Sequence, residues 1–174
     1  IFLGFSILMS GMNLMSSSVS PLASMPGFTE ALTLFRNPLL GVLVGAAFTG
    51  IIQSSAASVG ILQALSLTGS ISYGMALPII MGQNIGTCVT ALLSSIGTNK
   101  NAKRVAVIHV YFNLIGTLAG LLILLLARQF GASGALDAAV GPVGIAMLHS
   151  AFNILATALL LPFGKQLVKL AQMT

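Results

Sequence analysis

Two clusters of uncharged polar residues interrupt an otherwise apolar sequence, and both contain side chains of types that can bind ions. The first is Gln-Ser-Ser at 53–55, with Ser58 one turn further on, and the second is Gly-Gln-Asn-Ile-Gly-Thr at 82–87. Burying amides and hydroxyls in hydrocarbon is costly unless they find partners. Serine hydroxyls at a helix start favour an anion, phosphate above all, whereas amide and carbonyl oxygens suit a hard cation such as Na+.

Together the clusters supply ligands for an anion and cations with almost no ionised side chains, which suits a carrier because it must also release its cargo. The alternative is that these residues only pack helices closely, as serine clusters and Gly-x-x-x-Gly do in membranes. We expect the anion ligands to be Ser54, Ser55, Ser58, Asn84 and Thr87. We expect the cation ligands to be Gln53, Ser54, Gln83, Asn84 and Thr87.

The composition indicates an integral membrane protein. Of the 174 residues, 56% are hydrophobic and 5% charged, the mean hydropathy is +1.04, and soluble domains carry roughly 25% charged residues. The two carboxylates, Glu30 and Asp137, are far apart in the sequence, which argues against catalysis by paired acids. A single cysteine, Cys88, excludes an internal disulfide and a cysteine zinc cluster. The scattered basic residues indicate topology signals, and we expect no nucleic-acid partner.

The apolar runs predict an all-α membrane protein whose residues 1–174 form one unit. Because the chain starts inside an apolar segment, without methionine or a basic leader, we expect no signal peptide and a fragment or one half of something larger. The predicted elements are a transmembrane helix at 1–20, a connection at 21–37 with a short interfacial helix at 28–35, a hairpin at 38–68, and transmembrane helices at 73–96, 105–126 and 140–163.

We predict that the segment 38–68 enters the membrane and turns back at Gln53. Its first arm, 38–52, reaches roughly 22 Å at 1.5 Å per residue, which is shorter than the about 20 residues of a full span. Irregular backbone at membrane depth is tolerated where protein or a water-filled cavity covers it. The competing interpretation is one long tilted helix from 38 to 67.

We predict a second interruption within 73–96, which would make it a broken helix. Glycines flank Gln83 and Asn84 on both sides, and Pro78 precedes them. Glycine and proline are common where membrane helices kink or unwind. Such a break would free main-chain carbonyls for a cation.

The loop 98–104 holds three basic residues and is therefore predicted to be cytoplasmic, with binding of anionic lipids as the alternative role. The two following spans then bring Lys165 and Lys169 back to the same side. Arg36 and Arg128 fall on the opposite side and are exceptions to this rule.

A short motif occurs twice, forty residues apart, as His-x-x-Phe-Asn at 109–113 and at 149–153. Each histidine and asparagine are four residues apart, so they share a helix face. Metal ligation or a proton relay is the alternative, but we expect hydrogen-bonded structure. The two copies are predicted near opposite membrane surfaces. The structural polar residues are thus His109, Asn113, His149 and Asn153.

The run NPLLGVLVGAAFTGIIQSSAAS at 37–58, followed by ALPIIMGQNIGTCVTALLSSIGTNKNAKRVAVIHVYFNLIGT at 76–117, resembles the sodium/phosphate cotransporter family, the type II carriers and their bacterial relatives. The resemblance extends over roughly 30–165. Carriers of this family are built from inverted repeats, each with a Gln-Ser-Ser-Ser hairpin and a later Gly-Ala-Asn-Ile-Gly-Thr-Thr segment. The resemblance implies Na+-coupled symport of inorganic phosphate, with ligands at Gln53, Ser54, Ser55, Asn84, Gly86 and Thr87.

The chain departs from the family pattern at three motif positions, because Ala56 replaces the third hairpin serine and Gln83 and Cys88 replace the usual residues. It also has one Gln-Ser-Ser where the carriers have two. The resemblance therefore implies one repeat of an inverted-repeat transporter, similar to the second, C-terminal repeat. Its partners would be inorganic phosphate, Na+ as the co-transported ion, membrane lipids, and a second repeat or a homodimer copy.

The resemblance implies a protein that crosses the cell membrane several times, of the bacterial inner membrane type. No organic cofactor is expected. Two alternatives remain, a membrane scaffold or regulator that does not transport, and a carrier of a different small anion. A serine hydrolase using Ser54 and His109 is not expected, because the sequence has no Gly-x-Ser-x-Gly elbow and no acid placed to orient the histidine. We therefore expect no catalytic residues and no enzyme.

Overall fold

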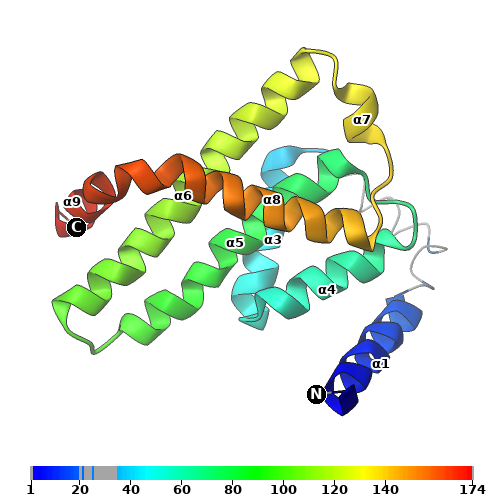
Figure 1. Ribbon diagram of the computed structural model, residues 1–174, viewed down its shortest axis with the longest axis horizontal. Coiled ribbons are helices and arrows are strands. Elements are labelled where there is room, and N and C mark those ends of the chain that lie inside the picture. Colours follow the sequence, from blue (N-terminus) through cyan, green and yellow to red (C-terminus); the bar gives the residue numbers. More distant parts are fainter. Residues whose placement is uncertain (1, 20, 22–24, 26–34, 174) are drawn as a thin grey trace.

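The computed structural model describes residues 2–19, 21, 25 and 35–173. The predicted interfacial helix at 28–35 lies outside the described residues except for its last residue, Phe35. Glu30 also lies outside them. Apart from one isolated β-bridge, the regular structure of the described part is helical (Figure 1). Its elements are α1 (Phe2–Val19), α3 (Pro38–Ile52), α4 (Ser55–Ser66), α5 (Tyr73–Ser95), α6 (Lys100–Gln129), α7 (Ser133–Asp137), α8 (Pro142–Leu160), the 3-10 turn η2 (Leu161–Phe163) and α9 (Gly164–Met173).

Three helical stretches of the described part are long and apolar enough to cross a membrane. They are Tyr73–Ser95, Lys100–Gln129 and Pro142–Met173, the last formed by α8, η2 and α9 together. They coincide with the predicted spans at 73–96, 105–126 and 140–163, and they confirm an all-α membrane protein. Helix α1 is one of the shorter apolar helices, as are α3 and α4, so a membrane crossing by 1–20 stays a prediction.

Local sequence signals explain where α3 and α6 begin. The Asn37 side chain accepts a hydrogen bond of 3.0 Å from the Leu39 N–H, and Pro38 occupies the first position of α3. An asparagine cap followed by proline is a favourable helix start, because proline lacks the N–H that would otherwise be unpaired. The Asn99 side chain caps α6 in the same way, accepting from the Ala102 N–H at 2.9 Å.

The predicted break in the 73–96 segment is wrong, because α5 is continuous from Tyr73 to Ser95. Pro78 lies in its second turn, where it removes a single intrahelical hydrogen bond. Gly82 and Gly86 are part of the regular helix and are buried against α3. The glycines therefore permit close packing between helices, and the helix keeps its own carbonyls paired.

Helices α3 and α5 run in the same direction and touch through backbone. A Cβ atom on Gly82 would collide with the Val42 carbonyl oxygen, and one on Gly45 with the Ile79 carbonyl oxygen. Further along, a Cβ on Gly86 would lie 2.6 Å from the carbonyl oxygen of Ala46. Small residues every four positions allow such an approach in membrane helices, where dispersion contacts drive association.

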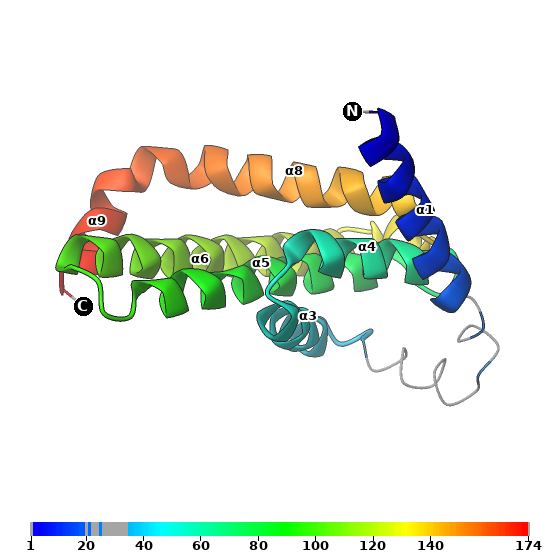
Figure 2. The ribbon, with the colours of Figure 1, turned by 90° about the horizontal axis from the view of Figure 1, so that it is seen from below.

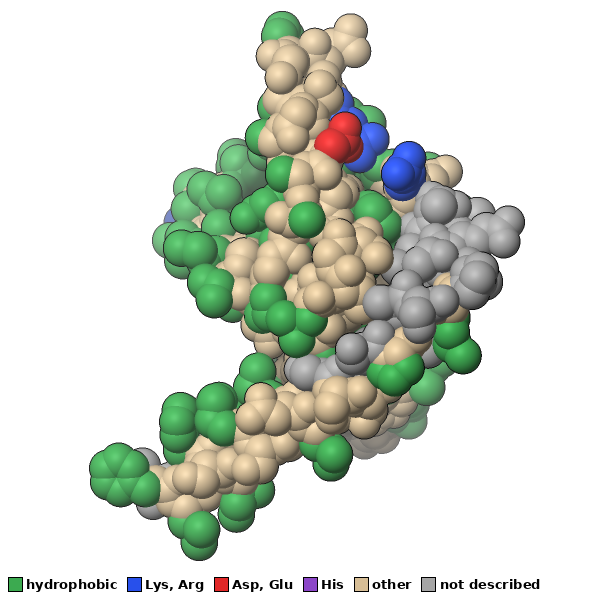
Figure 3. All heavy atoms as spheres, turned by 90° about the vertical axis from the view of Figure 1, so that its right-hand side faces the viewer, with side chains coloured by type: hydrophobic (Ala, Val, Ile, Leu, Met, Phe, Trp, Pro, Cys, Tyr) green, Lys and Arg blue, Asp and Glu red, His purple; other side chains and the backbone are tan. Residues whose placement is uncertain are grey.

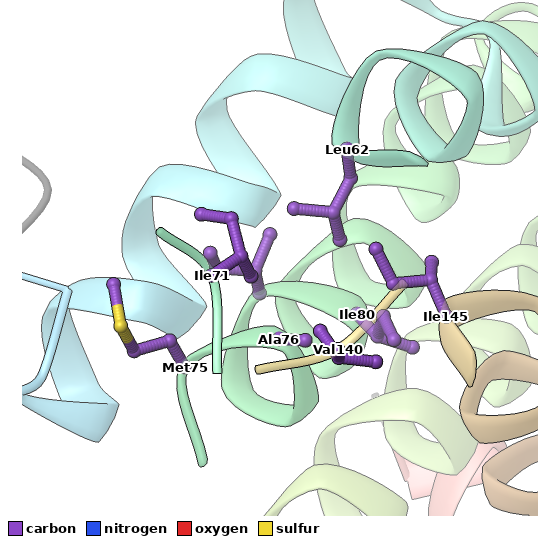
Figure 4. Packing of buried hydrophobic residues seen from close by; sticks show 8 residues of the cluster. Leu62, Ile71, Met75, Ala76, Ile80, Val140 and Ile145 are labelled. Atoms are coloured by element: carbon purple, nitrogen blue, oxygen red, sulfur yellow. The ribbon is translucent and has the colours of Figure 1, made fainter. Parts of the chain in front are cut away.

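A cluster of buried apolar residues lies where the α4–α5 connection meets the start of α8 (Figure 4). Two main-chain hydrogen bonds join these connections, from Val140 N–H to the Ile71 carbonyl at 2.9 Å and from Tyr73 N–H to the Ala138 carbonyl at 3.1 Å. They flank the isolated bridge between residues 72 and 139. The cluster thus fixes the far end of α4 relative to α5 and α8. Its members are Leu62, Ile71, Met75, Ala76, Ile79, Ile80, Val140 and Ile145.

Helices α6 and α8 pack antiparallel. A Cβ on Gly116 would contact Ala156 at 3.4 Å, and one on Gly120 would contact Phe152 at 2.9 Å. With this register, residue 149 lies level with about residue 123, which is 14 residues or roughly 21 Å from His109. The two copies of the His-x-x-Phe-Asn motif therefore lie at opposite ends of the helix pair, in agreement with the prediction.

The basic residues of the 98–104 loop and of α9 lie at one end of the molecule, at the left of Figures 1 and 2. Helix α9 was not predicted. It buries Leu167 and Ala171 against the rest of the chain and leaves Lys165 and Lys169 exposed. The α4–α5 connection and α7 lie at the other end, at the right of both views.

Candidate functional site

The chain leaves helical geometry at Gln53 and Ser54, so the alternative of one continuous helix from 38 to 67 is wrong. Gln53 has a left-handed backbone with φ 57° and ψ 24°, and among the described residues it is the one non-glycine residue with positive φ. Its N–H still donates to the Thr49 carbonyl at 2.7 Å, which closes α3. A left-handed glutamine costs about 1–2 kcal/mol and is a conformation that often marks a functional site. Figure 2 shows α4 departing from the end of α3 at this turn.

Ser54 starts α4 and leaves two main-chain donors free. Its backbone is extended, and its hydroxyl oxygen accepts a hydrogen bond of 3.2 Å from the Ala57 N–H. The N–H groups of Ser55 and Ala56 precede any possible intrahelical acceptor. Gln53 is exposed, and both serines are half-buried. The turn therefore presents free N–H groups and hydroxyls at the positive end of a helix dipole, an arrangement that binds anions.

Ser58 joins the two arms of the turn. Its hydroxyl lies 2.7 Å from the hydroxyl of Thr49, and both residues are 0% exposed. Removing one partner of a buried hydrogen bond leaves the other group unpaired. The bond fixes the angle at which α4 leaves α3. A role of Ser58 in phosphate binding stays a prediction, and it would require the Ser58 hydroxyl to exchange its hydrogen bond with Thr49 for one with phosphate.

We expect Thr49→Val and Ser58→Ala each to lower the free energy of unfolding by about 1–3 kcal/mol, because each leaves one buried hydroxyl without its partner. The double variant should lose no more than the worse single variant, since both hydroxyls then go together. Thermal unfolding of the four proteins in detergent measures this cycle. Strictly additive losses would show that the 2.7 Å contact contributes nothing.

Gln83 and Asn84 bring unpaired polar atoms into the protein interior. They are 2% and 7% exposed, and neither the Gln83 Oε1 nor the Asn84 Nδ2 has a hydrogen-bond partner. Native proteins rarely leave buried polar atoms unpaired, and each costs about 1–3 kcal/mol. The Gln83 Oε1 is an acceptor, which a cation would pair, and the Asn84 Nδ2 is a donor, which an anion would pair.

Gln83 lines an open cavity of about 210 Å3 between α3, α4 and α5. Phe48 and Ser58 line the same cavity, on the side of the α3–α4 turn. The sequence motif at 82–87 thus lies behind the turn, with its glycines against α3 and Gln83 facing the space between the two arms. The two polar clusters thus lie on neighbouring helices, and their joining into one binding site stays a prediction.

The remaining residues of the second motif are occupied within the protein. The Thr87 hydroxyl donates to the Asn84 carbonyl at 2.6 Å. Cys88 faces α6, where the Asn113 Nδ2 donates to its sulfur at 3.4 Å and to the His109 carbonyl at 3.0 Å. Cys88, one of the departures from the family pattern, therefore belongs to helix packing and not to the ion ligands.

The histidine motifs have a structural arrangement. Asn113 and Asn153 each donate from Nδ2 to the carbonyl four residues earlier, at 3.0 Å from His109 and 2.8 Å from His149. Such hydrogen bonds satisfy an amide within its own helix.

The α3–α4 turn and the second motif both lie where α3 packs against α5, but they do not line one common cavity. A Cβ on Gly50 would lie 3.2 Å from Val89, so the end of α3 lies beside the turn of α5 that follows the motif. Gln53 nevertheless faces outward, whereas Gln83 and Asn84 are buried. Sequence reasoning missed Thr49, and its signal was the spacing Gly41-x3-Gly45-x3-Thr49 opposite Pro78-x3-Gly82-x3-Gly86.

Comparisons with known proteins point to one family. The sequence profile described as Na+/Pi-cotransporter matches residues 7–157. The chain is 34% identical to the "Uncharacterized protein YqeW" of Bacillus subtilis over 121 residues, which is 70% of this chain and 38% of that protein. It is 29% identical to the "Putative inorganic phosphate export protein YjbB" of Escherichia coli over 163 residues, 92% of this chain and 29% of that protein.

A human relative is similar over the central part of the chain. The "Sodium-dependent phosphate transport protein 2C" of Homo sapiens is 39% identical over 102 residues, 53% of this chain and 17% of that protein. No solved structure matches. The chain thus spans 17–38% of the length of these relatives. The profile match over most of its length, together with the turn at Gln53-Ser54 and the motif behind it, shows that the chain belongs to the Na+/Pi-cotransporter family.

Proposed function

We propose that this chain is one repeat of a secondary active transporter that carries inorganic phosphate together with Na+ across a cell membrane. The observation that carries the proposal is the start of α4, where free N–H groups and serine hydroxyls follow a left-handed Gln53 in a member of this family. The relatives whose names state an activity are named for phosphate transport or export. Bacterial relatives agree with an inner membrane location.

Phosphate would be held at this turn by the N–H groups of Ser55 and Ala56 and by the hydroxyls of Ser54 and Ser55. Ser54 has a lone pair committed to the Ala57 N–H at 3.2 Å, which leaves its proton available to an anion. Ala56 contributes no hydroxyl, but its main-chain N–H is unaffected by the substitution. The departure from three serines therefore removes one donor and keeps the helix terminus.

Na+ would be held by neutral oxygens, which suits a cargo that must be released. The candidates inside the protein are the unpaired Gln83 Oε1 and the side-chain carbonyl oxygen of the buried Asn84, together with the hydroxyl oxygen of the half-buried Thr87. Gln53 is exposed at the turn, so its amide oxygen would hold a separate Na+ or join the others only after the turn moves. Hard cations prefer such ligands. Because Gln83 faces the cavity between the arms, Na+ there would couple the angle of the α3–α4 turn to the phosphate site, which links the two cargoes.

The second half of the site would come from another repeat, or from a second copy of this chain. The turn exposes Gln53, and the chain spans only 29% of the length of its relative YjbB. We place this chain as the second, C-terminal repeat. In inverted-repeat carriers the substrate lies between the repeats near the membrane midplane, and movement of one against the other switches access.

Coupling to Na+ is tested by flux. In proteoliposomes that contain the full-length transporter, replacing Na+ with choline should abolish phosphate movement, because the neutral oxygens would lack their cation. Flux that continues in choline contradicts the coupling. Loading phosphate inside or outside then separates uptake from export, the activity for which YjbB is named.

We expect Ser54→Ala to weaken phosphate binding at least tenfold, because it removes an anion donor and the cap of α4 at once. Ser17→Ala is the matched control, since the Ser17 hydroxyl donates only to the Leu14 carbonyl of its own exposed helix. Binding is measured by titration of purified protein with phosphate. Equal effects of the two substitutions would favour the packing interpretation.

A second candidate function is a scaffold or regulator that keeps the fold without transport, or a carrier of another small anion. A family of transporters favours a carrier over an enzyme, and we propose no catalytic residues. Phosphate binding without flux in the assembled protein would favour the scaffold.

A further inference from the structure

A second, charged pocket lies at the end of the molecule remote from the α3–α4 turn. It measures about 420 Å3. Arg36, Arg128 and Asp137 line it, and they come from three separate parts of the chain. Figure 3 shows this face, where positive side chains lie around a negative one. Its residues are Arg36, Gly69, Ser70, Ser72, Met75, Arg128, Asp137 and Ala139.

The two arginines are the basic residues that the positive-inside rule left unexplained, since they lie at the end opposite the basic loop and α9. Within the described part of the chain, no nitrogen of either arginine comes within 4.0 Å of the Asp137 carboxylate. Within the described residues, therefore, no direct ion pair neutralises their charges. Two guanidinium groups facing one cavity give it a positive potential that attracts oxyanions.

The fold positions Arg128 and a helix start toward this pocket. A Cβ on Gly74 would lie 2.9 Å from an Nη atom of Arg128, so the absent side chain provides the space in which the guanidinium lies. Ser72, the N-cap of α5, makes no side-chain hydrogen bond to its own helix, and it lines the pocket. Its free hydroxyl and the positive end of the α5 dipole add to the field of the arginines.

Asp137 gives this pocket a further property, because a carboxylate repels a fully ionised anion but accepts a hydrogen bond from a protonated one. Inorganic phosphate keeps at least one P–OH group at neutral pH, whereas sulfate has none. A carboxylate placed among arginines therefore favours phosphate over sulfate, since only phosphate can donate to it.

We propose that this pocket is a second binding site for inorganic phosphate, in which Arg36 and Arg128 bind the anion and Asp137 selects its protonated form. It lies beyond the far end of α4, whose 12 residues span about 18 Å, so it is distinct from the turn at Gln53-Ser54. The choice of phosphate as ligand rests on the proposed function. The pocket would collect phosphate at the membrane surface before the anion reaches the turn.

The test is the phosphate concentration dependence of flux in the full-length transporter. Arg36→Gln and Arg128→Gln should each raise KM for phosphate at least fivefold and leave the maximal rate within twofold. Gly74→Leu should act like Arg128→Gln, because it displaces that guanidinium. Unchanged KM in all three variants would overturn the proposal, whereas a wild-type protein without flux would instead contradict the proposed function.

Selectivity is tested by Asp137→Asn. Sulfate should inhibit wild-type phosphate flux weakly and the variant at least tenfold more strongly, because the repulsion is gone. Inhibition by sulfate that does not change would overturn the role of Asp137. If the pocket binds a lipid headgroup instead, adding phosphatidylglycerol to phosphatidylcholine vesicles should raise KM in wild type and not in Arg36→Gln, and this result would also overturn the proposal.

Discussion

Replacing Gly82 by alanine is expected to destabilise the protein by about 3 kcal/mol, although alanine is the better helix former. The new Cβ would collide with the Val42 carbonyl oxygen and lie within 2.9 Å of the Ala46 nitrogen. Both are backbone atoms of α3, so no side chain can rotate away, and the helices must separate. Separation would also displace Gln83 and the cavity between the arms, so the proposed phosphate transport should be lost as well.

Gly11→Ala is the matched control for this substitution. Gly11 also lies inside a helix, and nothing lies within 4 Å of a Cβ built on it. Alanine there should leave the melting temperature unchanged or raise it, since the substitution gains about 1 kcal/mol of helix propensity. Melting of purified protein in detergent measures both. Similar melting temperatures for the two variants would mean that α3 and α5 do not touch through their backbones.

Asn84→Leu is expected to change stability and transport in opposite directions. Asn84 is 7% exposed and its Nδ2 has no partner. An apolar side chain of similar size removes that unpaired group, which should raise the free energy of unfolding by about 1–3 kcal/mol. If Asn84 binds the transported ions, Na+-driven phosphate flux should fall at least tenfold, because the apolar side chain offers no ligand.

Gln83→Leu is the comparison for this variant. The Oε1 of Gln83 is also unpaired, so replacing Gln83 by leucine should give a similar gain in stability. Because Gln83 replaces the usual family residue, we expect a smaller loss of flux than for Asn84→Leu. Melting temperature and phosphate flux, measured in the same preparations, test both expectations for the two variants. Loss of stability in both variants would show that these amides are structural, and unchanged flux in Asn84→Leu would remove it from the ion ligands.

The sequence was most informative about features that depend on composition and short motifs. Low charge and long apolar runs determine that the chain is a helical membrane protein, since hydrocarbon tolerates few ionised groups. Asn37-Pro38 determines the start of α3 because capping is a local interaction. Gln53-Ser54 as a turn could be predicted for the same reason, since Ser54 is a preferred N-cap and the arms on both sides are short.

The prediction failed where a residue type has two uses. Gly82 and Gly86 look the same in sequence whether they weaken a helix or admit a neighbour, and only the position of α3 decided that they pack. Helix α9 was missed because the sequence after 163 was interpreted only as a basic end, although its apolar residues recur at Leu167 and Ala171 on one face.

By itself, then, the sequence determined the membrane class, the family likeness and the polar residues that we propose as ion ligands. The tertiary structure decided which of these are committed to the protein and which are not. It pairs Ser58 with Thr49 and Cys88 with Asn113, and it leaves Gln83 and Asn84 unpaired. It also brings Arg36 and Arg128 to one pocket. The physical reason is that hydrogen bonding and charge act over a few ångströms between residues far apart in the chain, and only the fold fixes those distances.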